Sequence, residues 1–143
     1  MNQEIYHVCN RTVFGHSLYL DGRDYIRFLT YLKEFNTSKN IDLRILFQLR
    51  RSNLRIMQSG QKLVEILAYC LMSNHYHLIV KQVFDHGISL FMQKLGTGYT
   101  LYMNKRHKFR GHIFQGKFHA QHITTGDQLL YTSAYVHTNP IKK

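Results

Sequence analysis

The apolar run 66–80 limits what this chain can fold into more than any other stretch. It is rich in β-branched and aromatic residues, and polar residues bound it on both sides. Such a run predicts one long strand inside a sheet. Two histidines, His75 and His77, interrupt it near its end. Because side chains alternate between the faces of a strand, we expect both imidazoles on one face, about 6.5 Å apart.

Two imidazoles in an apolar strand need partners. Burying a polar ring without a hydrogen bond costs free energy, and one metal ion would give both rings a partner. His75 and His77 are therefore candidate metal ligands. The alternative is a core histidine beside an edge histidine, each satisfied by a hydrogen bond.

The net charge indicates a polyanionic partner. The chain has 19 Lys and Arg against 8 Asp and Glu, a formal charge of +11, and 10 histidines in addition. Such an excess is typical of proteins that bind nucleic acid. The 10 tyrosines and 9 phenylalanines favour this interpretation, because exposed rings can stack on unpaired bases, although most must be core. The alternative is a basic protein without such a partner.

Length, cysteine content and hydropathy indicate the number of domains and the compartment of the protein. We expect residues 1–143 to form one domain that buries about two-thirds of its unfolded surface and needs no disulfides. Cys9 and Cys70 lie in apolar runs, which predicts buried thiols in a reducing compartment. No run approaches the ~20 apolar residues that span a bilayer, and the polar start is not a signal peptide. We therefore expect a cytoplasmic protein without a membrane partner.

The first half of the chain predicts a strand and a helix. Residues 5–12 alternate as a short strand, and residues 25–35 place apolar side chains on one helical stripe, with Asp21 or Asp24 as the N-cap. The segment 41–60 mixes arginines with apolar residues and fits a helix extension or a hairpin. A DNA-contacting arm and a solvated charged face both remain open for it.

The second half predicts two helices with a strand between them. Residues 88–103 carry a helical stripe interrupted by Gly96 and Gly98, which close packing against the sheet or a nucleic-acid backbone would explain. Residues 125–128 fit a capping box that opens a last helix, which ends before Pro140.

Residues 105–118 combine positive charges with rings and glycines. Lysine and arginine neutralise phosphates, and glycines let a backbone approach closely. The alternative is a solvated loop. Together with an arginine at the end of the first strand, this stretch supplies the candidate nucleic-acid-binding residues, which are Arg11, Lys105, Arg106, Lys108, Arg110, Gln115 and Lys117.

Three motifs resemble one known family. Residues 71–79, LMSNHYHLI, are similar to the L-M-P-N-H-x-H-L-L signature of single-tyrosine HUH transposases, with Ser73 in place of proline. Residues 111–118 resemble the family's G-x-L-F-Q-G-R-F, with Lys117 in place of arginine, and residues 135–140 its Y-x-x-x-N-P. The family includes REP-associated tyrosine transposases and insertion-sequence relatives. Shorter members lack a counterpart of residues 41–60, which therefore resemble an insertion.

The resemblance implies both a fold and a reaction. The fold is an α+β, ferredoxin-like sandwich with an antiparallel sheet and helices mainly on one face. The reaction is cutting and rejoining of single-stranded DNA beside hairpins through a 5′-phosphotyrosine, with Mg²⁺ or Mn²⁺ as the cofactor. The insertion-sequence relatives are commonly dimers, which leaves open a homodimer here and a site completed in one chain or between two.

The resemblance also assigns roles to residues. Tyr135 becomes the nucleophile, and Asn139 joins His75 and His77 as a metal ligand. Tyr131, one helical turn earlier, is the rival nucleophile but lacks an asparagine at the matching offset. Two other functions stay open. One is a domesticated module that binds a nucleic-acid hairpin without cutting it, and the other is a metal-dependent hydrolase that uses the histidines alone.

Overall fold

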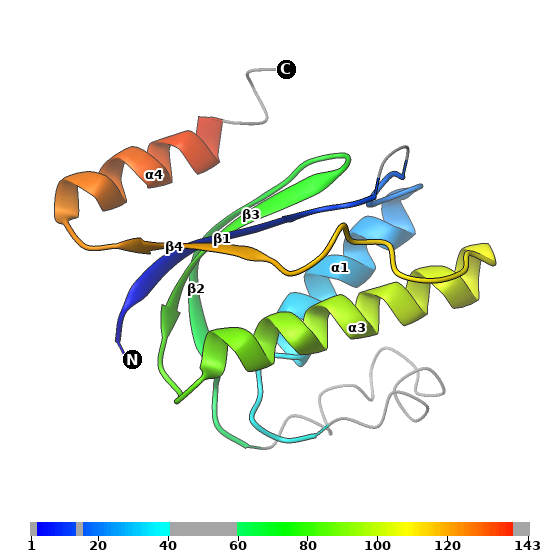
Figure 1. The fold of residues 1–143 in the computed structure, drawn as a ribbon, viewed down its shortest axis with the longest axis horizontal. Helices are drawn as coiled ribbons and strands as arrows, with labels where there is room; N and C mark the ends of the chain where they lie inside the picture. The colour runs from blue at the N-terminus through cyan, green and yellow to red at the C-terminus, as the bar shows by residue number, and fades with distance from the viewer. Residues whose placement is uncertain (1–2, 14–15, 41–59, 139–143) are drawn as a thin grey trace.

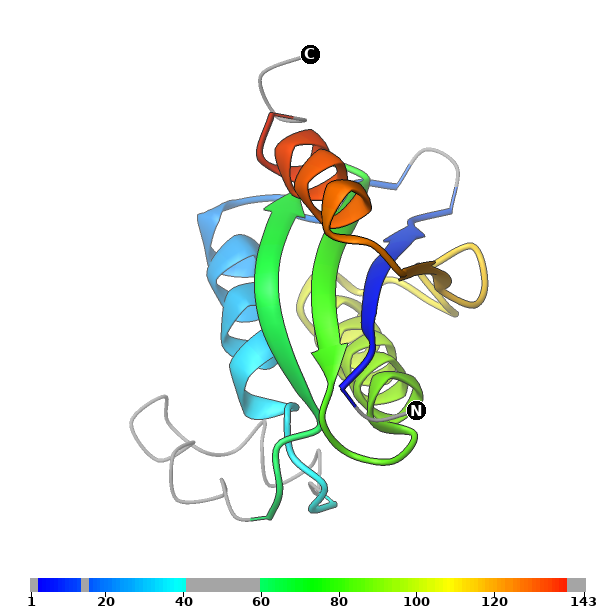
Figure 2. The same ribbon diagram turned by 90° about the vertical axis from the view of Figure 1, so that its left-hand side faces the viewer.

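The computed structural model describes residues 3–13, 16–40 and 60–138. The elements in this part of the chain are β1 (Ile5–Arg11), α1 (Gly22–Glu34), β2 (Val64–Leu71), β3 (His75–Gln82), α3 (Gly87–His107), β4 (His119–Ile123) and α4 (Gly126–Thr138). The strands form one antiparallel sheet in the order β2-β3-β1-β4 (Figure 1). Helices α1 and α3 cover one face, and α4 crosses the other (Figures 1 and 2). The predicted α+β, ferredoxin-like fold is confirmed.

The apolar run 66–80 forms two strands, so the prediction of one long strand is wrong. β2 ends at Leu71, β3 begins at His75, and the two pair antiparallel. The Met72 amide donates to the His75 carbonyl (2.8 Å) and closes the tight turn between them. Ser73 and Asn74 favour this turn because their side chains hydrogen-bond to nearby groups. Both strands are apolar, and the polar break between them, Ser73 and Asn74, is too short to divide the predicted run.

The two candidate caps of the first helix have different roles. Asp21 is the N-cap of α1, and its carboxylate accepts from two backbone N–H groups of the first turn (3.0 and 3.2 Å). Asp24 is fully buried and accepts from Tyr102, Arg106 and His107, all on α3. A buried polar network therefore joins the two helices.

The other elements lie close to their predicted positions. β1 ends one residue earlier than predicted, and α3 extends beyond 88–103 at both ends. At the start of α4, the Thr125 hydroxyl accepts from the Gln128 amide (3.1 Å), as a capping box requires. The Gln128 side chain accepts from the Thr124 amide (2.9 Å) and completes this cap one residue further out.

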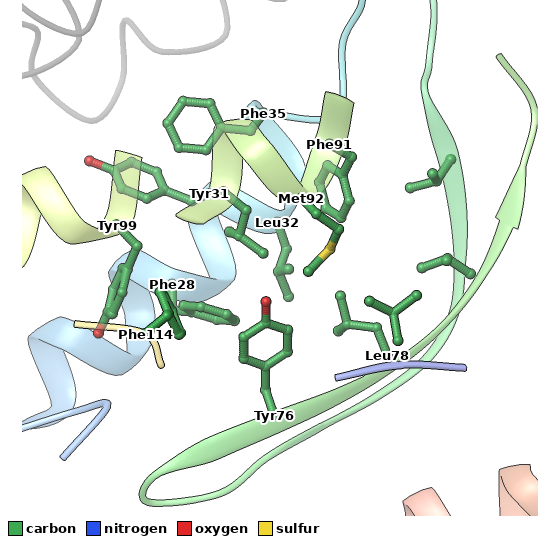
Figure 3. Packing of buried hydrophobic residues seen from close by; sticks show 14 of the residues in the cluster. Phe28, Tyr31, Leu32, Phe35, Tyr76, Leu78, Phe91, Met92, Tyr99 and Phe114 are labelled. Carbon is green, nitrogen blue, oxygen red and sulfur yellow. The ribbon is translucent and has the colours of Figure 1, made fainter. Parts of the chain in front are cut away.

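The main core lies between the sheet and the helices α1 and α3. Tyr76 and Leu78 point from β3 into this core, toward Phe28 and Leu32 of α1 (Figure 3). Tyr25, the first residue of the predicted α1 stripe, is exposed instead.

One glycine of α3 is required by close helix packing. A Cβ added at Gly98 would lie 2.4 Å from the ring of Phe35, at the end of α1, whereas a Cβ at Gly96 would meet nothing within 4 Å. The packing that explains Gly98 is therefore against the α1 region and not against the sheet.

A smaller cluster lies between the sheet and α4. It consists of Ala68, Cys70, Met72, Ile79, Ile123 and Val136. Cys70 is buried there as predicted, while Cys9 remains partly exposed. In the described part of the chain, no helix combines the length and apolar character that crossing a bilayer requires.

Candidate active site

β3 presents His75 and His77 on the face of the sheet that α4 crosses. Their neighbours Tyr76 and Leu78 point to the opposite face, into the main core (Figure 3). The two imidazole centroids are 5.1 Å apart, with the rings perpendicular (90°). His77 is only 8% exposed, and His75 is partly exposed. The two rings thus share one face, as strand alternation predicts.

A third histidine, His7 of β1, completes this cluster. Its Nε2 lies 3.0 Å from Nδ1 of His77, and the two rings stack with centroids 5.1 Å apart. No motif in the sequence singles out His7. The available signal is that His7 lies on the same face of β1 as Cys9 and Arg11. The pairing of β1 with β3 was not predictable from the sequence.

Burial favours the neutral form of His77 and His7. Burial, together with the neighbouring charges of His7, His75 and Arg11, lowers the pKa of His77 to about 4. Burial also lowers the pKa of His7. A neutral imidazole keeps one nitrogen lone pair, which is the form that binds metal ions. The Nε2 atom of His77 is buried and has no hydrogen-bond partner within the described ranges.

α4 brings Tyr135 to these histidines within the same chain. The Tyr135 ring lies edge-on to His77, with centroids 5.7 Å apart, and 6.5 Å from His7. Its neighbour Val136 is fully buried in the cluster beneath α4 and anchors the helix. Tyr135 is 39% exposed, whereas Tyr131, one turn earlier, is 76% exposed.

The described residues provide part of a metal site. The unpartnered Nε2 of His77 and the adjacent imidazole of His75 suit a cation that accepts nitrogen ligands. Within the described residues, 3–13, 16–40 and 60–138, no group of three or more His, Cys, Asp or Glu side chains is placed to hold a metal ion. The third predicted ligand, Asn139, lies outside these ranges, as do residues 41–59.

The candidate nucleic-acid contacts gather at the end of β1. Arg11 is exposed and pairs with His75 across the sheet, so both side chains share one face. The Gln115 amide donates to the Arg11 carbonyl (2.9 Å), and Asn10 donates to the Gly116 carbonyl (3.2 Å). These bonds hold the loop 108–118 beside Arg11. The exposed members of the predicted set near this loop are Lys105, Lys108, Arg110, Gln115 and Lys117.

Arg106 differs from the other predicted contacts. Its guanidinium donates to Asp21 (2.7 Å) and to buried Asp24 (2.6 Å), and its side chain is 25% exposed. The hydrogen bond from Arg106 holds the pKa of Asp21 well below its usual range. Arg106 therefore joins α1 to α3, and we leave it out of the DNA-binding surface proposed below.

One family matches most of this chain. A family model described as "Transposase IS200 like" matches residues 47–139 of the 143. The chain belongs to the IS200-like transposase family. The matched part of this IS200-like transposase begins inside the segment 41–60 and contains His75, His77, Tyr135 and Asn139. β1, which carries His7 and Arg11, lies before it.

A solved structure has a similar fold. A REP-associated tyrosine transposase bound to a REP hairpin superposes on the IS200-like transposase with a TM-score of 0.66 and 14% sequence identity. The similarity covers 99% of this chain and 69% of that chain. At this identity the likeness concerns the fold. No curated protein matches this chain.

Proposed function

We propose that this chain cuts and rejoins single-stranded DNA beside a hairpin, with Tyr135 as the nucleophile. The observation that carries the proposal is the position of the Tyr135 ring, 5.7 Å from the ring of His77, whose Nε2 has no hydrogen-bond partner among the described residues. A tyrosine hydroxyl and metal-binding nitrogens at one accessible point suit transfer of a phosphodiester. Membership of the IS200-like family supports the same reaction class.

The chemistry assigns a task to each residue. An ordinary phenol, with a pKa near 10, is a weak nucleophile at neutral pH and needs an activated phosphodiester. A divalent cation, Mg²⁺ or Mn²⁺, held by His75, His77 and Asn139 would act as a Lewis acid on the scissile phosphate. Burial keeps His77 neutral for that task. Because α4 holds the Tyr135 ring near His77, attack by its hydroxyl would carry a lower entropic cost.

The proposed step conserves the phosphodiester energy. The Tyr135 oxygen forms a bond to phosphorus, the bond to the 3′-oxygen breaks, and the phenolic proton is balanced by a proton taken up by that oxygen. The products are a 5′-phosphotyrosine and a free 3′-hydroxyl. A different 3′-hydroxyl can then attack the phosphotyrosine and rejoin the strand without an external energy source.

The DNA strand would be held by the exposed cations at the end of β1. Arg11 shares the face of His75, and the loop 108–118 is tied to β1 beside it. We propose that Lys105, Lys108, Arg110 and Lys117 neutralise phosphates there. A hairpin is the proposed partner because the similar REP-associated tyrosine transposase was solved bound to one.

The test uses hairpin-bearing single strands from the flanks of the gene, incubated with the protein and Mn²⁺. On a denaturing gel, 3′-labelled DNA should become linked to protein, and 5′-labelled DNA should yield a fragment with a free 3′-hydroxyl. Tyr135→Phe should bind the DNA without forming the adduct, and Tyr131→Phe should behave as wild type. Binding without any adduct from wild type would favour a non-cleaving hairpin-binding module. Cleavage that survives Tyr135→Phe would favour a hydrolase.

A further inference from the structure

The contact between His7 and His77 joins two neighbouring strands. β1 pairs with β3 so that Cys9 lies directly opposite His77, and His7 is offset by two residues on the same face. His7 Nε2 nevertheless approaches His77 Nδ1 to 3.0 Å, with the ring planes 19° apart. Only one of these two nitrogens can carry the shared proton if both rings are neutral.

The two possible proton positions differ at the opposite nitrogen of His77. If His7 Nε2 carries the proton, then His77 Nδ1 accepts it and His77 Nε2 must carry a proton itself. That N–H would be buried without an acceptor in the described part of the chain. Orphaned buried donors are rare and costly, and unfilled acceptors are better tolerated. The structure therefore favours a proton on Nδ1 of His77, donated to His7.

We infer that His7 is a positioning residue, which holds His77 in the tautomer with Nδ1 protonated and so reserves the Nε2 lone pair for a divalent cation. This inference rests on the metal site of the proposed function. His7 itself contacts neither the cation nor the DNA in this role. A hydrogen bond of this kind from the remote nitrogen is the usual device that orients a metal-binding histidine. His7 lies before the matched region 47–139, so the family match assigns it no role.

The first measurement is the tautomer of His77 in the metal-free full-length protein. Long-range ¹H–¹⁵N correlation spectra of protein with labelled histidine distinguish the protonated nitrogen, and a His77→Gln variant assigns the signal. We expect Nδ1 to be protonated in wild type. His7→Phe, which keeps a ring but removes the acceptor, should move the proton wholly or partly to Nε2. His7→Gln, whose amide oxygen can accept, should retain the wild-type tautomer.

The second measurement is Mn²⁺ affinity without DNA, followed by electron paramagnetic resonance or calorimetry. His7→Phe should weaken binding about tenfold or more, as loss of outer-shell hydrogen bonds does. His7→Gln should restore most of the affinity. The exposed His112→Phe is the matched control and should bind as wild type. Circular dichroism checks that each variant is folded.

The outcomes separate this inference from the proposed reaction. A wild-type His77 protonated at Nε2, or a His7→Phe protein with unchanged tautomer and unchanged Mn²⁺ affinity, overturns the inference even if the DNA adduct forms. The predicted tautomer and affinities without any DNA adduct would leave the positioning role intact and refute the strand-transfer reaction. If His7→Phe fails to fold, the tautomer of wild-type His77 still tests the inference. A folded His7→Gln protein that lost the wild-type tautomer and Mn²⁺ affinity would also contradict it.

Discussion

Two buried polar groups, one on each face of the sheet, differ in how fully they are hydrogen-bonded. On the α1–α3 face, the buried Asp24 carboxylate accepts from the Leu20 amide (3.0 Å) and from Tyr102, Arg106 and His107. On the α4 face, His77 Nε2 is buried with no partner inside the described ranges. A saturated group stabilises the fold, and an unsaturated one is available to a ligand. Of these two groups, Asp24 serves stability on the α1–α3 face, and His77 lies on the face of the proposed chemistry.

The packing of the two faces follows the same division. The α1–α3 face is filled by large aromatic rings such as Phe28, Tyr76 and Tyr99 (Figure 3). The cluster beneath α4 is small, with Val136 at its centre. Val136 and Tyr135 are sequence neighbours, but one is fully buried and the other 39% exposed. The same helix turn thus anchors α4 and presents the proposed nucleophile.

The largest effect should follow a change that removes chemistry without removing packing. Tyr135→Phe deletes the attacking oxygen and keeps the ring, so adduct formation should fall by about 10⁴-fold or more. Because Tyr135 is partly exposed, the unfolding temperature should stay near that of wild type. Gel quantitation and thermal denaturation measure the two quantities. A Tyr135→Phe protein that is strongly destabilised would break the division between the faces.

The next effect should appear on the opposite face, in stability. Asp24→Asn leaves Arg106 and His107 beside a neutral amide in a buried site, and should lower the free energy of unfolding by about 3 kcal/mol or more at pH 7. Urea denaturation measures this change. Metal affinity on the α4 face should be unchanged in the folded variant, and a loss of Mn²⁺ binding would contradict the separation.

The Asp24 effect should also depend on pH. Burial raises the pKa of Asp24, but hydrogen bonds from Leu20, Tyr102 and Arg106 outweigh it and leave the pKa below its ordinary value. The charged carboxylate therefore stabilises the fold fully above the unfolded-state pKa of about 4, and this stabilisation is lost as the pH falls through the lower folded-state pKa. In urea denaturation, the difference in the free energy of unfolding between wild type and Asp24→Asn should thus be smaller at pH 3 than at pH 7.

The smallest effect compares two glycines on one helix. Gly98→Ala places a Cβ 2.4 Å from the Phe35 ring and should cost about 1–3 kcal/mol. Gly96→Ala meets no atom within 4 Å and should stabilise α3 by about 0.5–1 kcal/mol. Denaturation of both variants measures the difference. Equal effects would show that α3 does not pack on α1 as closely as described.

The sequence predicted the fold through motifs that stand in order along the chain. A capping box and Pro140 located α4. Periodicity located α1 and α3, because each buries one apolar stripe. It failed at residues 72–74, because the reversal takes only the two polar residues Ser73 and Asn74, with apolar strands on both sides. The predicted burial of Tyr25 is wrong for a related reason. The spacing of residues shows which side chains share a stripe, but not which of them are exposed at its edge.

The sequence predicted some residues of the candidate site and missed others. Strand alternation identified His75 and His77 as candidates, and the resemblance to the family added Tyr135. The structure brings His77 and Tyr135 together. Arg106 was assigned to DNA contact because charge alone does not show that Asp21 and Asp24 lie within reach. His7 was missed because its contact depends on which strands are neighbours. Pairing between distant strands is a property of the whole fold.

The short turn between β2 and β3 makes the site sensitive to chain length. Side chains on a strand repeat every second residue, so slipping β3 by one position would turn both imidazoles toward Phe28 and Leu32, and bring Tyr76 to face α4. The Met72–His75 hydrogen bond closes the turn that carries the chain from β2 into this frame. A single inserted residue there would therefore be more harmful than many substitutions, and variation in this turn should occur by exchange of residues, not by insertion or deletion.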